Sequence, residues 1–263
     1  MDLRLKNIRA LVTGASRGLG YATARILSFE GARLVINGRD YTRLQTAAAR
    51  ISGETGNPVH GIAGDLASAP VAEELVRTAY ETMGGLDILV CNAGGPPPGA
   101  FETFDDVTWQ KAIDLTFMSN VRLIKAALPY LRKSDTASVL TITSYSAKQP
   151  IPNLVLSNSI RAATIGLTKS LALELGKDGI RFNSILPAWT ETERVTELMT
   201  ARAKNSGTTL QAEIARQAAE SPLGRMATPD EFANVAVFLV SPLASYMTGI
   251  MLSVDGGMLK GTF

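Results

Sequence analysis

A glycine-rich segment near the N-terminus restricts the fold more than any other feature of the chain. Apolar and β-branched residues predict a strand at Ile8–Thr13, which runs into Gly14-Ala15-Ser16-Arg17-Gly18-Leu19-Gly20, and a helical pattern begins at about Gly18. Glycines let the backbone approach a pyrophosphate closely, and the first N–H groups of a helix favour anionic groups. The order of strand, glycine turn and helix therefore predicts a dinucleotide-binding unit, the alternative being a tight turn that holds no ligand.

The rest of the chain alternates between short apolar runs and longer helical patterns, which predicts a parallel sheet wound by helices. Further strands are expected at Arg33–Asn37, Val59–Ala63, Ile88–Asn92, Ser138–Thr143, Arg181–Leu186 and Met251–Val254, and helices near residues 19–29, 40–52, 68–83, 105–132, 156–176 and 229–240. Runs such as Ile88-Leu89-Val90-Cys91 are apolar throughout, as is typical of strands covered on both faces. We therefore expect an α/β fold, a doubly wound Rossmann domain with a seven-stranded parallel sheet and helices on both faces.

One segment departs from this alternation. Residues 189–221 are polar and helical in pattern and contain no expected strand. An insert of this size after a late strand is typical of a mobile substrate lid rather than of a second domain. With 263 residues and no linker-like stretch, we expect one domain over residues 1–263 with a helical lid at about 189–221.

Composition excludes several classes of function. The net charge is +2 and the basic residues are scattered, which argues against a nucleic-acid partner. No run of eighteen apolar residues predicts a membrane span, and the charged N-terminal segment lacks the apolar run of a signal peptide. The single cysteine, Cys91, excludes an internal disulfide and fits a cytoplasmic protein, and with the single histidine, His60, it leaves no expected metal site. A small molecule is the expected substrate.

The end of the second expected strand indicates which dinucleotide is bound. An NAD enzyme has a carboxylate there for the ribose hydroxyls, whereas this chain has Gly38 in that place, followed by Arg39. Arg17 lies within the glycine turn, and two guanidinium groups beside a missing acid suit a 2′-phosphate. We therefore predict NADP, the alternative being that Arg39 only solvates the next helix.

Motifs along nearly the whole chain resemble the short-chain dehydrogenase/reductase family, and most of all its 3-oxoacyl-carrier-protein-reductase-like members. They are the glycine turn, Asn92-Ala93-Gly94, Ser144 before a Pro-containing loop, and Val254-Asp255-Gly256-Gly257. The resemblance implies that the adenine contacts Asp65, the ribose contacts 92–94, and the nicotinamide amide contacts Thr190 and Thr192. The implied cofactor-binding residues are Gly14, Ser16, Arg17, Gly18, Leu19, Gly20, Arg39, Asp65, Leu66, Asn92, Ala93, Gly94, Arg161, Pro187, Thr190 and Thr192. It also implies a homotetramer built through two long helices and the C-terminal end.

Three polar positions of the family's active site are changed. Family members carry a Tyr thirteen residues after the serine and a Lys four residues later, whereas counting from Ser144 leads here to Ser157 and Arg161. Asp114 stands where the family has an Asn on the long central helix. The catalytic candidates are therefore Ser144, Ser157, Arg161 and Asp114.

The chemistry of these changes decides what can be expected of the site. A serine hydroxyl is a much weaker acid than a phenol, and a guanidinium stays protonated and cannot relay a proton. Ordinary carbonyl reduction should be crippled, although hydride transfer remains possible if water or another group supplies the proton. Tyr145 and Lys148 are candidates, but strand alternation predicts that Tyr145 faces away unless the loop turns, as an ordinary packed tyrosine. We also expect an ion pair between Asp114 and Arg161, either catalytic or structural.

The leading hypothesis is an NADP-dependent oxidoreductase with a non-standard proton donor. A cofactor-binding sensor or partner subunit without redox turnover is a second hypothesis, and a non-redox enzyme that reuses the pocket is a third. The rim at Gly94–Gly99 and the roof at Trp189 and Met199 indicate an apolar or extended substrate, unless they serve only in packing.

Overall fold

The sheet has the expected parallel, doubly wound arrangement. The structure, a computed structural model, describes residues 2–262. Its seven strands lie in the order β3-β2-β1-β4-β5-β6-β7, and every neighbouring pair is parallel. The bounds are β1 Arg9–Val12, β2 Arg33–Gly38, β3 Val59–Ala63, β4 Ile88–Cys91, β5 Ser138–Ile142, β6 Arg181–Pro187 and β7 Met251–Val254. The strand order reverses between β1 and β4, which is where ligands bind in such sheets.

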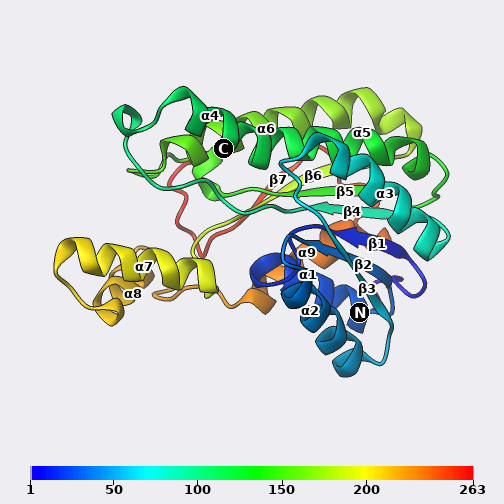
Figure 1. Cartoon of the computed structure of the whole chain (residues 1–263), viewed down its shortest axis with the longest axis horizontal. Coiled ribbons are helices and arrows are strands. Elements are labelled where there is room, and N and C mark those ends of the chain that lie inside the picture. The colour runs from blue at the N-terminus through cyan, green and yellow to red at the C-terminus, as the bar shows by residue number, and fades with distance from the viewer. Residues whose placement is uncertain (1, 263) are drawn as a thin grey trace.

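Helices cover both faces of the sheet (Figure 1). Their bounds are α1 Gly18–Phe29, α2 Tyr41–Thr55, α3 Ala69–Met83, α4 Asp106–Ile113, α5 Ser119–Leu131, α6 Val155–Leu175, α7 Glu193–Ser206, α8 Leu210–Ala218 and α9 Pro229–Val240. One face packs against α1, α2 and α9 and the other against α3, α5 and α6, so the apolar core forms two layers. The fold class expected from the sequence is confirmed, and none of the helices between residues 2 and 262 has the length and apolar content to cross a bilayer.

The central strands are buried on both sides, which explains their continuous apolar sequence. All four residues of β4 are buried, and Cys91 at its end is 1% exposed. Burial raises the pKa of the Cys91 thiol far above its ordinary value because the thiolate would lose its hydration. At the opposite end of β4, Asp87 accepts hydrogen bonds from Arg9 Nη2 at 2.6 Å and from Ser134 Oγ at 2.6 Å, which joins β1 to the loop before β5.

The segment expected as one helix over 105–132 is divided in two. A π-helical turn at Asp114–Met118 separates α4 from α5. The hydroxyl of Thr116 donates to Ala112 O at 2.7 Å, and the amide of Asn120 donates to Thr116 O at 2.9 Å. Side chains that bond to carbonyls of the preceding turn widen a helix locally, and such bulges change the direction of the side chains around them.

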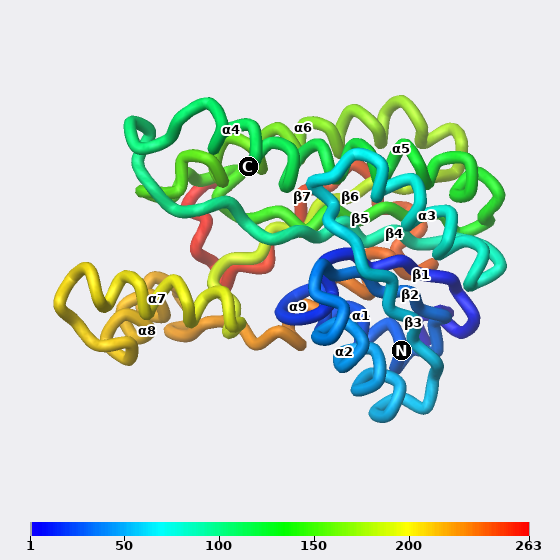
Figure 2. The backbone as a smooth tube through the Cα atoms, in the orientation of Figure 1, coloured from blue at the N-terminus to red at the C-terminus, as the bar shows by residue number. Residues whose placement is uncertain are grey.

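The segment after β6 forms two helices and no strand, as expected. Helices α7 and α8 pack against each other and extend away from the sheet, at the left of Figures 1 and 2. A small apolar cluster of Tyr145, Trp189, Met199, Met226 and Met258 lies where this pair joins the rest of the molecule.

Candidate active site

A pocket of about 430 Å³ lies at the carboxyl ends of the central strands, where the strand order reverses. It gathers every site residue expected from the sequence except Gly20 and Asp114. The expected residues that line it are Gly14, Ser16, Arg17, Gly18, Leu19, Arg39, Asp65, Leu66, Asn92, Ala93, Gly94, Ser144, Ser157, Arg161, Pro187, Thr190 and Thr192. The strand ends thus bring together residues far apart in the sequence.

The glycine turn is held tightly against the end of β4. Gly14 has φ +56°, and a Cβ there would lie 2.6 Å from Asn92 O. The Asn92 side-chain amide donates to Gly14 O at 3.0 Å. Gly20 is absent from the pocket wall because it packs beneath the turn, where a Cβ would lie 2.5 Å from Gly14 O. Both glycines therefore serve close backbone packing.

The N-terminus of α1 fits the phosphates of a dinucleotide. Its N-cap residue, Arg17, offers no side-chain acceptor, whereas α2 and α9 are capped by Asp40 and Thr228. The first N–H groups of α1 therefore face the pocket without a side-chain cap, together with the positive end of the helix dipole. This uncapped end, next to a backbone kept bare by glycine, can accept a pyrophosphate.

The two arginines expected at the adenosine end have different surroundings. Arg39 lines the pocket and is exposed, and it joins none of the ion pairs among residues 2–262. Arg17 Nη1 instead contacts Glu193 at 2.8 Å and Glu197 at 3.0 Å, both on α7. No pattern in the sequence had predicted this contact between the glycine turn and α7.

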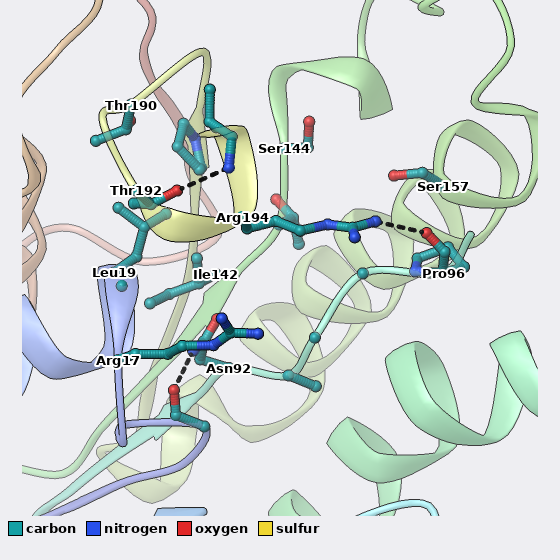
Figure 3. Close-up of a pocket in the computed structure, with 18 of the residues that line it drawn as sticks. Arg17, Leu19, Asn92, Pro96, Ile142, Ser144, Ser157, Thr190, Thr192 and Arg194 are labelled. Atoms are coloured by element: carbon teal, nitrogen blue, oxygen red, sulfur yellow. Dashed lines mark hydrogen bonds between the residues drawn. The ribbon is translucent and has the colours of Figure 1, made fainter. Parts of the chain in front are cut away.

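Ser144 and Ser157 lie at the other end of the pocket (Figure 3). Arg161, which is hydrogen-bonded to Ser157, also lines the pocket. Ser144 follows β5, and its Oγ accepts from Ser146 N at 3.1 Å, which caps a short 3₁₀ turn. Ser157 is in the first turn of α6, and its Oγ accepts from Arg161 Nε at 3.1 Å. Arg161 Nη1 donates to Thr143 O at 2.6 Å, which anchors the guanidinium at the end of β5.

Arg161 is a cation without a carboxylate partner in the described part of the chain, where its hydrogen bonds go to a hydroxyl and to carbonyls. Burial, and secondarily the charge of Arg194, lowers its pKa to about 10. Arg161 therefore remains charged at neutral pH.

The prediction of an ion pair between Asp114 and Arg161 is wrong. Asp114 accepts instead from Arg122 Nη2 at 2.7 Å and from Gln110 Nε2 at 3.0 Å, and these bonds lower its pKa. The π-helical turn at Asp114–Met118 lies between the helices of these partners, while the Arg161 guanidinium is occupied at the end of β5. Asp114 therefore lies outside the pocket wall.

Tyr145 lines the pocket because the loop turns, which was the stated exception to the expectation that it faces away. A 3₁₀ turn over Tyr145–Ala147 begins directly after Ser144, so the alternation of strand side chains no longer applies. Burial raises the pKa of the Tyr145 phenol, a shift that the neighbouring Trp189 indole opposes. Lys148 is not part of the pocket wall, and its Nζ donates to Met251 O at 3.1 Å.

Arg194 is a pocket residue that the sequence reasoning missed. It extends from α7 across the pocket, and its Nη2 donates to Pro96 O at 3.3 Å (Figure 3). The only available signal was its place in the insert, four residues after Thr190. Thr192 caps α7 by accepting from Val195 N, and Thr190 pairs with Ala227 in an isolated bridge.

Comparisons with known proteins agree with this geometry. The family model described as enoyl-(acyl carrier protein) reductase matches residues 14–259. The chain is 34% identical to dehydrogenase/reductase SDR family member 4 of Bos taurus over 97% of its own length and 88% of the relative's. It is 32% identical to a 3-oxoacyl-[acyl-carrier-protein] reductase of Aquifex aeolicus, over 98% of this chain and 100% of that one.

Solved structures give the same result. The L-sorbose reductase of Gluconobacter frateurii, complexed with NADPH and L-sorbose, superposes with a TM-score of 0.95 at 34% identity and covers 99% of this chain and 100% of its own. The actinorhodin polyketide ketoreductase with NADPH gives a TM-score of 0.92 at 30% identity, over 97% of this chain and 98% of its own. The family model, the relatives and the shared fold together establish that this chain belongs to the short-chain dehydrogenase/reductase family.

Proposed function

We propose that this protein is an NADP-dependent oxidoreductase that acts on a carbonyl or alcohol group of a small molecule, with a non-standard proton donor. The observation that carries the proposal is a single pocket in which an uncapped helix N-terminus meets two serine hydroxyls and a half-buried guanidinium. Similar solved reductases with NADPH support the choice of cofactor.

The residues that would hold NADP divide along the pocket. The first N–H groups of α1 would bind the pyrophosphate, and Arg39 and Arg17 the 2′-phosphate. Asp65 would contact the adenine, and 92–94 the ribose. Thr190, Thr192, Pro187 and Arg161 would surround the nicotinamide riboside, and the bound cofactor supplies or accepts the hydride.

The substrate oxygen would lie between Ser144 and Ser157. Because Ser157 Oγ accepts a bond from the Arg161 guanidinium, its O–H is polarised and becomes a better hydrogen-bond donor. Two hydroxyls and a nearby positive charge can stabilise the charge that develops on the oxygen during hydride transfer. This electrostatic stabilisation takes the place of a strong general acid.

The proton then comes from Tyr145 or from water. The raised pKa of Tyr145 keeps its phenol protonated at neutral pH, so it can donate to an alkoxide, which is far more basic. Its burial against Trp189 and Met226 limits its reach, and therefore water is the second source.

The direct test is an NADPH titration beside a broad screen of carbonyl and alcohol substrates. We expect the unmodified protein to bind NADPH and to reduce generic ketones slowly. The double variant Ser157→Tyr with Arg161→Lys should raise that rate by about 10²-fold, because a positioned general acid is worth that much. Ser157→Tyr alone is the matched control, since it adds the phenol but keeps the Arg161 guanidinium, and so shows what the change Arg161→Lys contributes.

Other outcomes separate the alternatives. Unmodified protein that turns over at about 1–10³ per second would show that another residue supplies the proton efficiently. A folded double variant that binds NADPH but reduces none of the carbonyls would favour the sensor, the partner subunit or the non-redox enzyme. Failure to bind NADPH would overturn the proposal.

A further inference from the structure

Two arginines at the substrate end of the pocket carry charge that the chain itself does not balance. We infer that this end recognises an anionic substrate, one whose carboxylate lies between Arg161 and Arg194 while its carbonyl or hydroxyl faces Ser144 and Ser157. The inference names the substrate class of the proposed oxidoreductase and so rests on that function.

The first argument is the bonding of Arg161. Its Nε and Nη1 are used by Ser157 and by carbonyls at the end of β5, whereas Nη2 has no hydrogen-bond partner among residues 2–262. This Nη2 lies 3.7 Å from the position that a Cβ on Gly95 would take, so it faces the loop that forms the pocket rim. A guanidinium that is held in place and has one nitrogen without a partner can donate hydrogen bonds to an anion.

The second argument is Arg194, which reaches the same loop from α7. Its Nη2 donates to Pro96 O at 3.3 Å, and Figure 3 shows it extended toward Ser157 across the pocket. Its one ion pair within the described chain is long, 3.8 Å to Glu197, and Glu197 also contacts Arg17 at 3.0 Å. Arg194 is therefore only weakly neutralised.

The electrostatics agree with the geometry. Arg194 adds to the burial that lowers the pKa of Arg161, so the two charges repel each other across the pocket. The carboxylates of the pocket wall leave Arg161 unpaired: Glu193 contacts Arg17, Glu197 is shared between Arg17 and the more distant Arg194, and Asp65 forms no ion pair within residues 2–262. A carboxylate between the guanidinium groups would relieve the repulsion and form charge-assisted hydrogen bonds.

The apolar rim does not oppose this inference. Pro96, Trp189 and Leu198 also line the pocket and can cover the carbon chain of an extended acid. An oxo acid or hydroxy acid with an apolar chain satisfies both the apolar wall and the cationic pair. The sequence indicated only the apolar part because Arg194 was not recognised.

The test compares carboxylates with neutral compounds of the same shape. Hexanoate and benzoate are titrated into NADPH-saturated protein beside hexanamide and benzamide, by calorimetry. NADPH is chosen because the reduced nicotinamide carries no positive charge, so any preference reports the protein's own cations. We expect each carboxylate to bind about 10-fold or more tightly than its amide.

Variants identify the residues responsible. Arg194→Gln should lower carboxylate affinity about 10-fold without changing amide affinity, and Arg194→Lys should restore part of it. Arg216→Gln, on the exposed face of α8, is the control and should change neither affinity. Three outcomes would each overturn the inference. They are equal affinities for acid and amide, no carboxylate binding up to about 50 mM, or a carboxylate affinity that Arg194→Gln leaves unchanged. Loss of NADPH binding would instead overturn the proposed function. The same titrations without cofactor would then show whether the protein still prefers a carboxylate to its amide.

Discussion

At the scale of single residues, Arg39 and Gly38 lie together in the pocket wall, at the end proposed to bind adenosine. Arg39 is exposed, and a Cβ added at Gly38 would lie 3.1 Å from Ser16 Cβ, so an acidic side chain there would crowd the glycine turn. The steric fit and the exposed cation both favour a phosphorylated ribose over one with free hydroxyls. The sequence alone had indicated the missing acid at Gly38 and the charge of Arg39, but not this steric restriction.

Cofactor preference can be checked at Arg39. The unmodified protein should bind NADPH more tightly than NADH, and Arg39→Asp should reverse the preference, because it replaces a cation with an acceptor for ribose hydroxyls. Fluorescence titration with both cofactors measures the ratio, and Arg43→Asp on the exposed side of α2 is the control. Equal dissociation constants for the unmodified protein would contradict this account.

Asp87 gives a pH-dependent prediction. Burial opposes its ionisation, but hydrogen bonds from Arg9 and Ser134 outweigh that effect and lower its pKa. The ionised Asp87 therefore stabilises the fold at pH values above its unfolded pKa, which is near 4. This stabilisation is lost as pH falls through the lower pKa of the folded state. Asp87→Asn should therefore lower the free energy of unfolding by about 2 kcal/mol at pH 7.

Urea unfolding measures this difference. The gap between Asp87→Asn and the unmodified protein should shrink as pH falls below about 4, because Asp87 then takes up a proton in the unfolded chain while it stays ionised in the folded one. The charge contribution is lost once pH has fallen through the lowered folded pKa. Asp135→Asn is the control, since Asp135 forms no ion pair within residues 2–262. A gap that stayed constant down to about pH 2 would show that the carboxylate charge is not what stabilises this end of β4.

At the scale of elements, the strands were predicted far better than the insert. Continuous apolar runs such as Ile88–Cys91 specify buried parallel strands by composition alone, and β3 and β7 have the bounds expected for them. The division of 105–132 was missed because a π-turn depends on local bonds such as Thr116 to Ala112 O, which leave no periodic signal. Turn geometry also brought Tyr145 into the pocket, which strand alternation could not predict.

The sequence predicted which residues line the candidate site, but not which charged residues form ion pairs there. Nearly all of the residues predicted from sequence position line the pocket, because the carboxyl ends of parallel strands meet at one edge. Ion pairs depend on the reach of long side chains, and complementary charge at Asp114 and Arg161 gave the wrong partner for each. Arg194 was missed for the same reason, since its role comes from where α7 lies.

The contact between α7 and the glycine turn gives a prediction about cofactor affinity. Glu193 and Glu197 contact Arg17, which would otherwise be free for the 2′-phosphate. The double variant Glu193→Gln with Glu197→Gln should raise NADPH affinity about 2- to 5-fold, because the pairs are exposed and individually weak. NADH affinity should not change. Glu74→Gln on α3 is the control, and an unchanged NADPH affinity in the double variant would show that Arg17 does not bind the phosphate.

At the scale of the whole molecule, exposed apolar side chains predict an assembly. Leu173 on α6 is 78% exposed, and the loop with the fully exposed Tyr246 lies beside it, since Lys169 Nζ donates to Gly249 O at 3.2 Å. Together with the family resemblance, this surface favours a homotetramer with symmetric helix-to-helix contacts.

Light scattering at micromolar protein concentration measures the mass of the assembly and so its oligomeric state. Leu173→Glu should reduce the mass below that of a tetramer, because a carboxylate would be buried at the contact. Ile214→Glu on α8 is the control and should keep the mass of the unmodified protein. A monomeric unmodified protein would rule out the assembly.

The burial of Cys91 has a practical consequence for following the molecule over time. It is the only cysteine of the chain, it lies at the end of a central strand, and its raised pKa keeps the thiol unreactive while the sheet is intact. A thiol reagent can therefore modify the protein only when the middle of the sheet opens. The rate of labelling therefore measures how often the sheet opens, without an introduced probe. A slower rate with NADPH would show how far a ligand at the strand ends stabilises the centre of the sheet against opening.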